Sequence, residues 1–445
     1  MNYKIGMVSL GCAKNRVDAE MLLYRLKEGG YTLCDDPAMS DVAIVNTCGF
    51  IESAKQESID EILELATLKK EGKIKAIIVT GCLAERYREM IMQELPEVDS
   101  VVSIGCNGDI VKAVENALNN QKTELFGDKM NFPMEGGRVQ STPRHYAYLK
   151  VAEGCDNKCT YCAIPLIRGG FRSRKIENII AEAKFLAEGG VKELLVVAQD
   201  TTRYGEDLYG KPYLAELLRE LCKIDGIKWI RVMYCYPDRV TDELLEVMAS
   251  EEKIVKYMDI PLQHCNGRVL KTMNRRGDRE SITNLINKIR DKVQGIVLRT
   301  TIIAGFPTET ESEFEELAEF AKELKFERLG CFAYSQEEDT VAGEMDGQLD
   351  DEVKQRRAEI IMEQQQIIME EYTNNLVGKT VEVLVEGFDK YAECWFGRSF
   401  ADAPEVDGNV FFTVSQSHSK PHEGDFVKVK ITDILDTDPV GELIV

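Results

Sequence analysis

The sequence predicts an α/β protein of three parts: an N-terminal doubly wound α/β domain, a central partial (β/α)6 barrel and a C-terminal small β-barrel. Three observations support this. Residues 1–120 alternate short apolar runs with helical periodicity. Six further strand candidates, interleaved with helices, follow within residues 144–370. Residues 371–445 contain short alternating runs separated by Gly and Asp.

Four apolar runs are the expected strands of the first domain. They are Tyr3–Leu10, Val42–Thr47, Lys75–Thr80 and Asp99–Ile104. A segment with helical periodicity follows each run, which predicts a parallel sheet. Residues 121–143 are polar and include Gly136, Gly137 and two prolines, so we expect a linker there.

The expected strands of the central barrel are regularly spaced. They are Tyr146–Val151, Glu193–Ala198, Trp229–Met233, Lys256–Ile260, Leu298–Ile303 and Arg328–Ala333. Periodic Ile and Met make Asp350–Tyr372 an amphipathic helix that we expect to pack on the barrel. The C-terminal strands are expected at Thr380–Val385, Val410–Val414 and Phe426–Ile431.

Composition limits the function classes. The chain has 445 residues, of which 44% are hydrophobic and 30% charged, the balance of a globular protein. The first apolar run is too short for a signal peptide, and we expect a cytoplasmic protein without a membrane span. Thirteen cysteines in such a chain indicate metal or redox chemistry rather than disulfides.

The charge of the chain indicates the kind of partner. A formal net charge of -22 repels phosphate backbones and favours basic partners, so strong nucleic-acid binding is not expected. Solubility alone is the alternative explanation for this charge.

The most specific motif is a loop of three cysteines directly after the first expected barrel strand. Cys155, Cys159 and Cys162 have the spacing Cys-x3-Cys-x2-Cys. Three thiolates can hold three irons of a [4Fe-4S] cluster and leave the fourth iron open for S-adenosylmethionine (SAM). The alternative is a zinc site, but a structural zinc site needs four ligands, and the nearest His, His145, lies ten residues upstream.

A second set of three cysteines is dispersed in the sequence. Cys12, Cys48 and Cys82 each follow an expected strand of the first domain. The carboxyl ends of parallel strands share one edge of a sheet, so these cysteines are expected to converge. Each lies beside an expected helix start, where backbone donors lower a thiol pKa. Three separate core cysteines are the alternative. Cys106 follows the fourth strand and could lie near this group.

These motifs, in this order and ahead of a small β-barrel, resemble the methylthiotransferases, which combine a methylthiotransferase domain, a radical SAM barrel and a TRAM domain. Several strings resemble the RimO branch, which modifies an aspartate of ribosomal protein S twelve (uS12). They are Val8–Asn15, Gly154–Gly169, Ala198–Gly205, Pro261–His264 and Ala403–Gly408.

The resemblance implies two [4Fe-4S] clusters, one on Cys155, Cys159 and Cys162 and a second on Cys12, Cys48 and Cys82. The second cluster would carry the sulfur that is transferred. One SAM would methylate that sulfur, and another would supply the radical that activates the β-carbon of the substrate aspartate. A sulfur donor and a reducing electron donor are implied as partners. The resemblance also divides the chain into residues 1–120, a linker at 121–143, a barrel at 144–370 and a TRAM domain at 371–445.

SAM contacts are expected at the mouth of the barrel. Tyr161 has the aromatic position that radical SAM proteins place against adenine. Three more expected contacts, Gln199, Asp200 and Gln263, follow the second and fourth strands, and Gly305 follows the fifth. All of them could instead be structural. The chain differs from the family at Thr308, where a Gly is usual.

Two other functions stay open. A tRNA methylthiotransferase acting on a modified adenosine beside the anticodon is the nearest, and a non-catalytic iron-sulfur RNA-binding factor is the other. The C-terminal module argues against tRNA, because residues 371–445 hold fourteen Asp and Glu against six Lys and Arg, a formal charge of -8. Such a surface complements a basic small-subunit ribosomal protein. Asp402, Glu405 and Asp407 are the first expected contacts with it.

Overall fold

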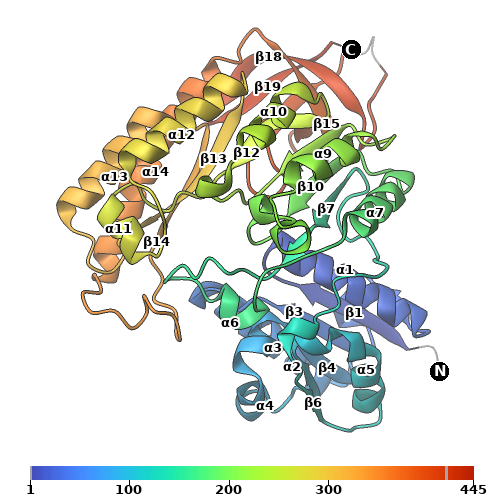
Figure 1. The fold of residues 1–445 in the computed structure, drawn as a ribbon. Coiled ribbons are helices and arrows are strands. Elements are labelled where there is room, and N and C mark those ends of the chain that lie inside the picture. The colour runs from blue at the N-terminus through green and yellow to red at the C-terminus, as the bar shows by residue number, and fades with distance from the viewer. Residues whose placement is uncertain (1–2, 416–418, 445) are drawn as a thin grey trace.

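A computed structural model of the chain describes residues 3–415 and 419–444. The N-terminal domain is a six-stranded parallel sheet in the order β2-β1-β3-β4-β5-β6 (Figure 1). Its strands are β1 (Lys4–Ser9), β2 (Thr32–Cys34), β3 (Val42–Thr47), β4 (Ala76–Gly81), β5 (Ser100–Val102) and β6 (Thr123–Leu125). Four of these strands were predicted. The edge strands β2 and β6 were missed, and β6 lies within the segment predicted as a linker.

Helices cover both faces of this sheet, which confirms the doubly wound fold. They are α1 (Ala13–Glu28), α2 (Glu52–Lys70), α3 (Cys82–Tyr87), α4 (Glu89–Glu94) and α5 (Ile110–Leu118), with 3-10 turns at Pro37–Met39, Ile104–Asp109 and Lys129–Asn131. Leu22 of α1 and Ala113 of α5 share one apolar cluster. Ile62 of α2 and Leu83 of α3 belong to the cluster on the other face.

The central domain is an open parallel sheet of six strands in the order β14-β13-β12-β11-β10-β7, as expected for a partial barrel. The strands are β7 (Tyr146–Lys150), β10 (Glu193–Val197), β11 (Trp229–Val232), β12 (Ile254–Asp259), β13 (Val297–Ala304) and β14 (Arg328–Ala333). A short antiparallel pair, β8 (Ala152–Glu153) and β9 (Arg172–Ser173), was not predicted.

The helices of the central domain pack mainly on one face of the barrel sheet, except that α6 contacts α3 of the N-terminal domain. They are α6 (Ile164–Arg168), α7 (Ile176–Glu188), α8 (Glu206–Tyr209), α9 (Leu214–Cys222), α10 (Asp242–Ser250), α11 (Gly267–Thr272), α12 (Arg279–Lys292) and α13 (Glu311–Leu324), with 3-10 turns at Thr201–Arg203 and Pro237–Arg239. Helix α14 (Asp351–Asn374) packs on β14 and α13, as its amphipathic pattern predicted.

The C-terminal domain is a closed five-stranded barrel in the order β15-β16-β17-β19-β18. Its strands are β15 (Thr380–Asp389), β16 (Cys394–Arg398), β17 (Val410–Thr413), β18 (Phe426–Leu435) and β19 (Asp438–Leu443). The small β-barrel is confirmed, and β16 and β19 were missed.

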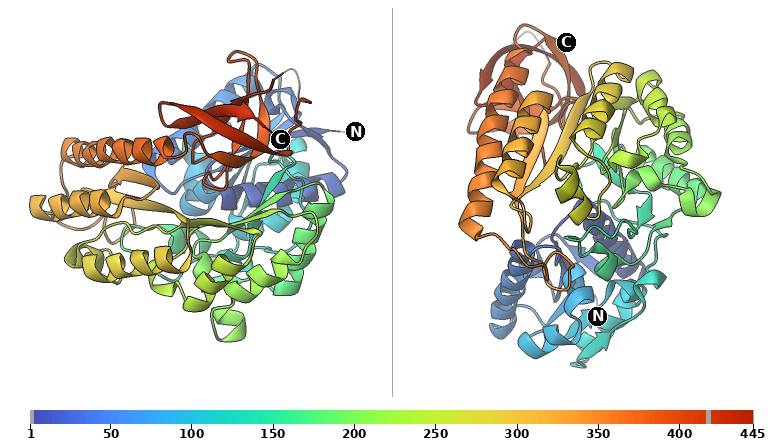
Figure 2. Two further views of the ribbon diagram at one scale, coloured as in Figure 1. Left: turned by 90° about the horizontal axis from the view of Figure 1, so that it is seen from above. Right: turned by 60° about the vertical axis from the view of Figure 1, so that its left-hand side comes forward.

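One apolar cluster joins all three domains. Tyr148 and Trp229 lie on the barrel face opposite the helices, where they pack with Val17 of α1 and with Leu384 and Ala403 of the C-terminal domain. Figure 2 shows the red C-terminal strands on this face of the sheet. The face therefore belongs to the protein interior.

The acidic residues expected to bind a basic substrate contact the other domains here. The expectation is wrong for Asp402 and Asp407, whose carboxylates are buried, whereas Glu405 is exposed and stays a predicted contact. Asp402 is buried and its Oδ1 accepts from Arg328 Nη2 at 2.5 Å. Asp407 is bonded to Tyr257 of the barrel. Glu405 pairs with Arg16 of α1 at 2.9 Å and accepts from Tyr148. The charge count did not reveal that these acids hold the domains together.

In the part of the chain that the structure describes, no helix combines the length and apolar character of a membrane span.

Candidate active site

The three dispersed cysteines meet at one edge of the N-terminal sheet, as predicted. Strands β1, β3 and β4 are neighbours, with Ser9 opposite Asn46 and Thr47 opposite Gly81. Cys12, Cys48 and Cys82 follow these strands. The packing is tight, because a Cβ on Gly11 would lie 3.0 Å from Cys48 Sγ. The charges of Cys12 and Cys48 both act on the pKa of Cys82.

The expected lowering of thiol pKa values holds for one of the three. Cys12 is exposed at the surface. Desolvation by the surrounding protein disfavours its thiolate, but the charges of Lys14 and Arg168 and two backbone donors outweigh this effect, so the pKa falls. Burial raises the pKa of Cys48 and raises that of Cys82 to about 12. The prediction is wrong for these two because desolvation exceeds the effect of backbone donors.

Cys106 does not join this group. A Cβ on Gly127 would lie 2.8 Å from Cys106 Sγ, so the thiol faces the segment before the second domain. Burial raises its pKa, and the charges that act on it are those of Asp109, Glu85 and Arg88 rather than of the three cysteines.

The second trio lies in the loop between β8 and α6. Cys162 N donates to Cys159 O at 3.0 Å, and Cys155 N donates to Gly169 O at 3.1 Å, so backbone bonds shape the loop. Burial raises the pKa of Cys155 to about 11 and that of Cys162 to about 12.

Two barrel side chains approach the thiol of Cys159. Tyr236 Oη lies 3.9 Å and Arg275 Nη1 lies 3.8 Å from its Sγ. Arg275 is buried and also donates to Pro261 O at 2.6 Å. A polar cavity of about 260 Å³ adjoins this contact. It is lined by Asp156, Asn157, Tyr236, Asp238, Arg239, Lys271, Asn274, Arg275 and Arg276.

Asp200 supports the loop. Its Oδ2 accepts from Asn157 Nδ2 at 2.9 Å and from Arg239 Nη1 at 3.2 Å. Arg239 Nη1 also donates to Asn157 Oδ1 at 2.9 Å, so Asn157 of the loop, Asp200 and Arg239 all contact one another. Asp200 was expected to bind SAM, and here its carboxylate is occupied by these partners.

The other expected SAM contacts lie at the carboxyl ends of the barrel strands. Tyr161 is half-buried against the barrel core, with its Oη 3.4 Å from Arg275 Nη1. Gln199 Nε2 donates to Glu153 Oε1 at 2.9 Å, and its own buried Oε1 has no partner among the described residues. Gln199 thus has an acceptor free for a ligand.

Gln263 and Gly305 have backbone roles. Gln263 pairs with Ile302 of β13 and has φ +72°. Gly305 packs against α14, because a Cβ there would lie 2.6 Å from Lys354 Cγ. Thr308 has φ +66°, a conformation that is strained for a β-branched residue and explains the glycine usual at this position.

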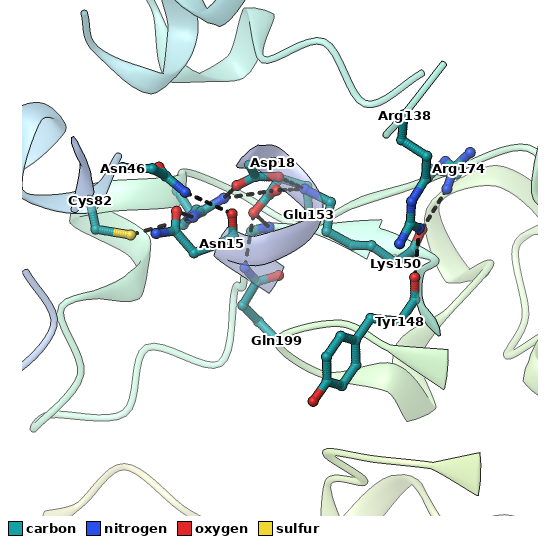
Figure 3. A network of polar contacts seen from close by, with 12 residues as sticks. Asn15, Asp18, Asn46, Cys82, Arg138, Tyr148, Lys150, Glu153, Arg174 and Gln199 are labelled. Atoms are coloured by element: carbon teal, nitrogen blue, oxygen red, sulfur yellow. Dashed lines mark hydrogen bonds and ion pairs between the residues drawn. The ribbon is translucent and has the colours of Figure 1, made fainter. Parts of the chain in front are cut away.

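A buried polar network extends from Cys82 of the N-terminal domain to Gln199 of the barrel (Figure 3). Arg168 Nη2 is 3.4 Å from Cys82 Sγ, and Arg168 Nη1 is 3.2 Å from Glu153 Oε2. Arg168 and Lys150 both pair with Asp18 of α1. Glu153 in turn holds Gln199. This network connects a thiol of the N-terminal domain to a predicted SAM contact of the barrel.

Sequence reasoning missed several of these residues. The supporting residues are Asn15, Asp18, Glu153, Asn157, Arg168, Tyr236, Arg239 and Arg275. Some lie inside the quoted strings, but their partners are distant in sequence. Arg168 and Asp18, for example, are separated by 150 positions, and no local pattern indicates that contact.

The donor sets suit clusters rather than a single ion. Within residues 3–415 and 419–444, no three His, Cys, Asp or Glu side chains gather closely enough to hold one metal ion. A [4Fe-4S] cluster makes a different demand, since each thiolate binds its own iron. Two groups of three thiols with no fourth ligand meet that demand.

Comparisons with known proteins agree with the three-part fold. The family models that match are "Uncharacterized protein family UPF0004" over residues 4–103, "Radical SAM superfamily" over 149–321 and "TRAM domain" over 377–444. Solved structures support the fold alone. The radical SAM methyltransferase TsrM from Kitasatospora setae is 12% identical, with a TM-score of 0.57 over 75% of this chain and 77% of that one.

Whole-length relatives are much closer. The ribosomal protein uS12 methylthiotransferase RimO of Clostridioides difficile is 50% identical over 442 residues, 99% of both chains. That of Clostridium botulinum (strain Eklund 17B / Type B) is 48% identical over 99% of this chain and 98% of its own.

The fold, the two thiol groups and the matched models together define a radical SAM transferase with a TRAM domain. Within that class, the chain belongs to the ribosomal protein uS12 methylthiotransferase family.

Proposed function

We propose that this protein adds a methylthio group to the β-carbon of an aspartate in ribosomal protein uS12. One observation carries the proposal: two groups of three thiols lie in adjoining domains, and Arg168, in the helix that follows the loop of the second group, contacts Cys82 of the first. When bound, one [4Fe-4S] cluster supplies the electron that cleaves SAM to a radical, and the other carries the sulfur, which a second SAM methylates.

The residues divide this work between the domains. Cys155, Cys159 and Cys162 would hold the cluster that binds SAM, and Gln199 would offer its free Oε1 to SAM. Tyr161, Gln263 and Gly305 would shape the SAM pocket, while Asp200 holds the loop. Cys12, Cys48 and Cys82 would hold the sulfur-carrying cluster.

The substrate proposal is supported by the relatives and by charge. Both named relatives are uS12 methylthiotransferases. The chain is strongly acidic, which favours a basic ribosomal protein over tRNA. Of the three acids first expected to contact this substrate, Glu405 is the exposed one. A ribosomal substrate implies action in the cytoplasm, with an electron donor and a sulfur donor as further partners.

Incubation of the anaerobically reconstituted enzyme with SAM, a reductant and either purified uS12 or unmodified tRNA tests this function. Mass spectrometry should find the methylthio group on the aspartate of uS12. Its appearance on tRNA alone would support the tRNA alternative, and SAM that stays intact would support a non-catalytic iron-sulfur factor.

A further inference from the structure

Arg168 is the last residue of α6, the helix that begins directly after the loop of Cys155, Cys159 and Cys162. Its side chain is 1% exposed and crosses into the N-terminal domain. There its Nη2 lies 3.4 Å from Cys82 Sγ and donates to Asn15 Oδ1 at 3.1 Å. An arginine on the barrel therefore donates to a sulfur in the other domain.

The contact with Asn15 connects Arg168 to the segments that precede the other two cysteines. Asn15 Nδ2 donates to Leu10 O at 2.8 Å and to Thr47 O at 3.2 Å. Leu10 lies two residues before Cys12, and Thr47 directly precedes Cys48. Arg168 thus contacts the thiol of Cys82 directly. Through the side-chain amide of Asn15 it also contacts the ends of the strands that precede Cys12 and Cys48.

The guanidinium is held in place by charge. Asp18 and Glu153 both bind Arg168 and Lys150, and all four side chains are at most 1% exposed. Two cations and two carboxylates balance each other, so Arg168 is stable as a buried cation. Because the planar guanidinium offers donors in fixed directions, its Nη2 cannot leave Cys82 without breaking the pairs on Nη1.

The apolar residues around Cys82 come from α6 and from the residue directly before it. Cys82 packs in an apolar cluster with Ala163 and Ile167 of the barrel. Water is therefore kept from this sulfur, and a hydrogen bond in a dry environment has a larger electrostatic effect than one in water.

We propose that Arg168 is a positioning residue that raises the reduction potential of the cluster held by Cys12, Cys48 and Cys82. This inference rests on the proposed function, which assigns those ligands. Hydrogen bonds to ligand sulfurs and nearby charge set the potentials of iron-sulfur clusters. A cationic donor on Cys82 stabilises the more negative, reduced cluster, so its removal makes reduction harder.

Arg138 provides a matched control. It is also buried, and it also joins α1 to the barrel, through pairs with Glu20 and with Glu182 and a bond to Tyr148 O at 2.6 Å. No cysteine of the described chain is among its hydrogen-bond and ion-pair partners. A variant at Arg138 removes a domain contact of the same kind without removing a donor to sulfur.

The test is a redox titration, followed by electron paramagnetic resonance, of full-length protein in which Cys155, Cys159 and Cys162 are all alanine. Only the N-terminal cluster then contributes. Arg168→Gln should shift its midpoint potential to more negative values, Arg168→Lys should shift it less, and Arg138→Gln should leave it at the parent value. An unchanged potential in Arg168→Gln, or an equal shift in Arg138→Gln, overturns the proposal.

Two further readouts separate the possible failures. If Arg168→Gln does not hold a cluster, the potential of Arg168→Lys tests the proposal, because lysine keeps the charge but loses the planar geometry. An unshifted potential in Arg168→Lys then overturns the proposal. If the parent protein shows no cluster signal, the ligand assignment in the proposed function fails and this inference fails with it. If the parent protein shows the cluster signal and the variants have its midpoint potential, the role of Arg168 is refuted while the ligand assignment stands.

Discussion

The two cysteine trios differ in how the chain builds them. Cys155, Cys159 and Cys162 occupy one short loop, so their proximity is guaranteed by the covalent chain. Cys12, Cys48 and Cys82 come from the ends of three neighbouring strands, so their proximity depends on the whole parallel sheet. The comparison shows that a local motif can be recognised alone, whereas a dispersed one needs a correct topology.

The trios also differ in electrostatics. Burial raises the pKa values of Cys155 and Cys162, and Arg275 only partly offsets this for Cys162. In the N-terminal trio, Lys14 and Arg168 lower the pKa of Cys12 below its ordinary value. The pKa of Cys12 is thus shifted in the opposite direction from those of Cys48 and Cys82.

The largest expected effect comes from the loop trio. Replacing Cys155, Cys159 or Cys162 with Ala should remove one cluster and abolish SAM cleavage while the fold persists, because these thiols serve the cofactor. Iron content and formation of deoxyadenosine measure both effects. A variant that made deoxyadenosine at the parent rate would disprove the radical SAM assignment of this loop.

Replacing Cys12, Cys48 and Cys82 together should separate the two functions. SAM cleavage should continue and methylthiolation of uS12 should stop, because the radical generator lies in the other domain. Deoxyadenosine and the mass of uS12 are measured in the same reaction. Loss of both activities in a well-folded variant would contradict this division.

Asn157→Ala should have a smaller effect. Asn157 connects the loop to Asp200 and Arg239, and loss of an outer-shell partner lowers metal affinity or activity about 10- to 100-fold. We expect SAM cleavage to fall in this range with methylthiolation falling in parallel. Asn116→Ala, at a helix end of the other domain, is the control. An unchanged rate of SAM cleavage in Asn157→Ala would show that the loop keeps its conformation without these contacts.

Sequence reasoning predicted the architecture because it depends on periodic apolar runs. It missed β2 and β6, since three residues at a sheet edge carry no period. It predicted that Cys12, Cys48 and Cys82 converge at the carboxyl ends of neighbouring strands, but it could not predict Arg168, which has partners in another domain. It wrongly expected Asp402 to bind the substrate, because a count of charges carries no information on burial and this acid is 4% exposed.

The smallest expected effect tests the boundary of the N-terminal trio. Cys106 follows β5, the strand next to β4, and sequence alone could not separate it from the ligands. In the fold its thiol faces Gly127. Cys106→Ser should therefore keep both clusters, the parent iron content and the parent rate of methylthiolation, because serine fills nearly the same volume. A halved iron content would make Cys106 a ligand and would show that convergence at the sheet edge extends to a fourth strand.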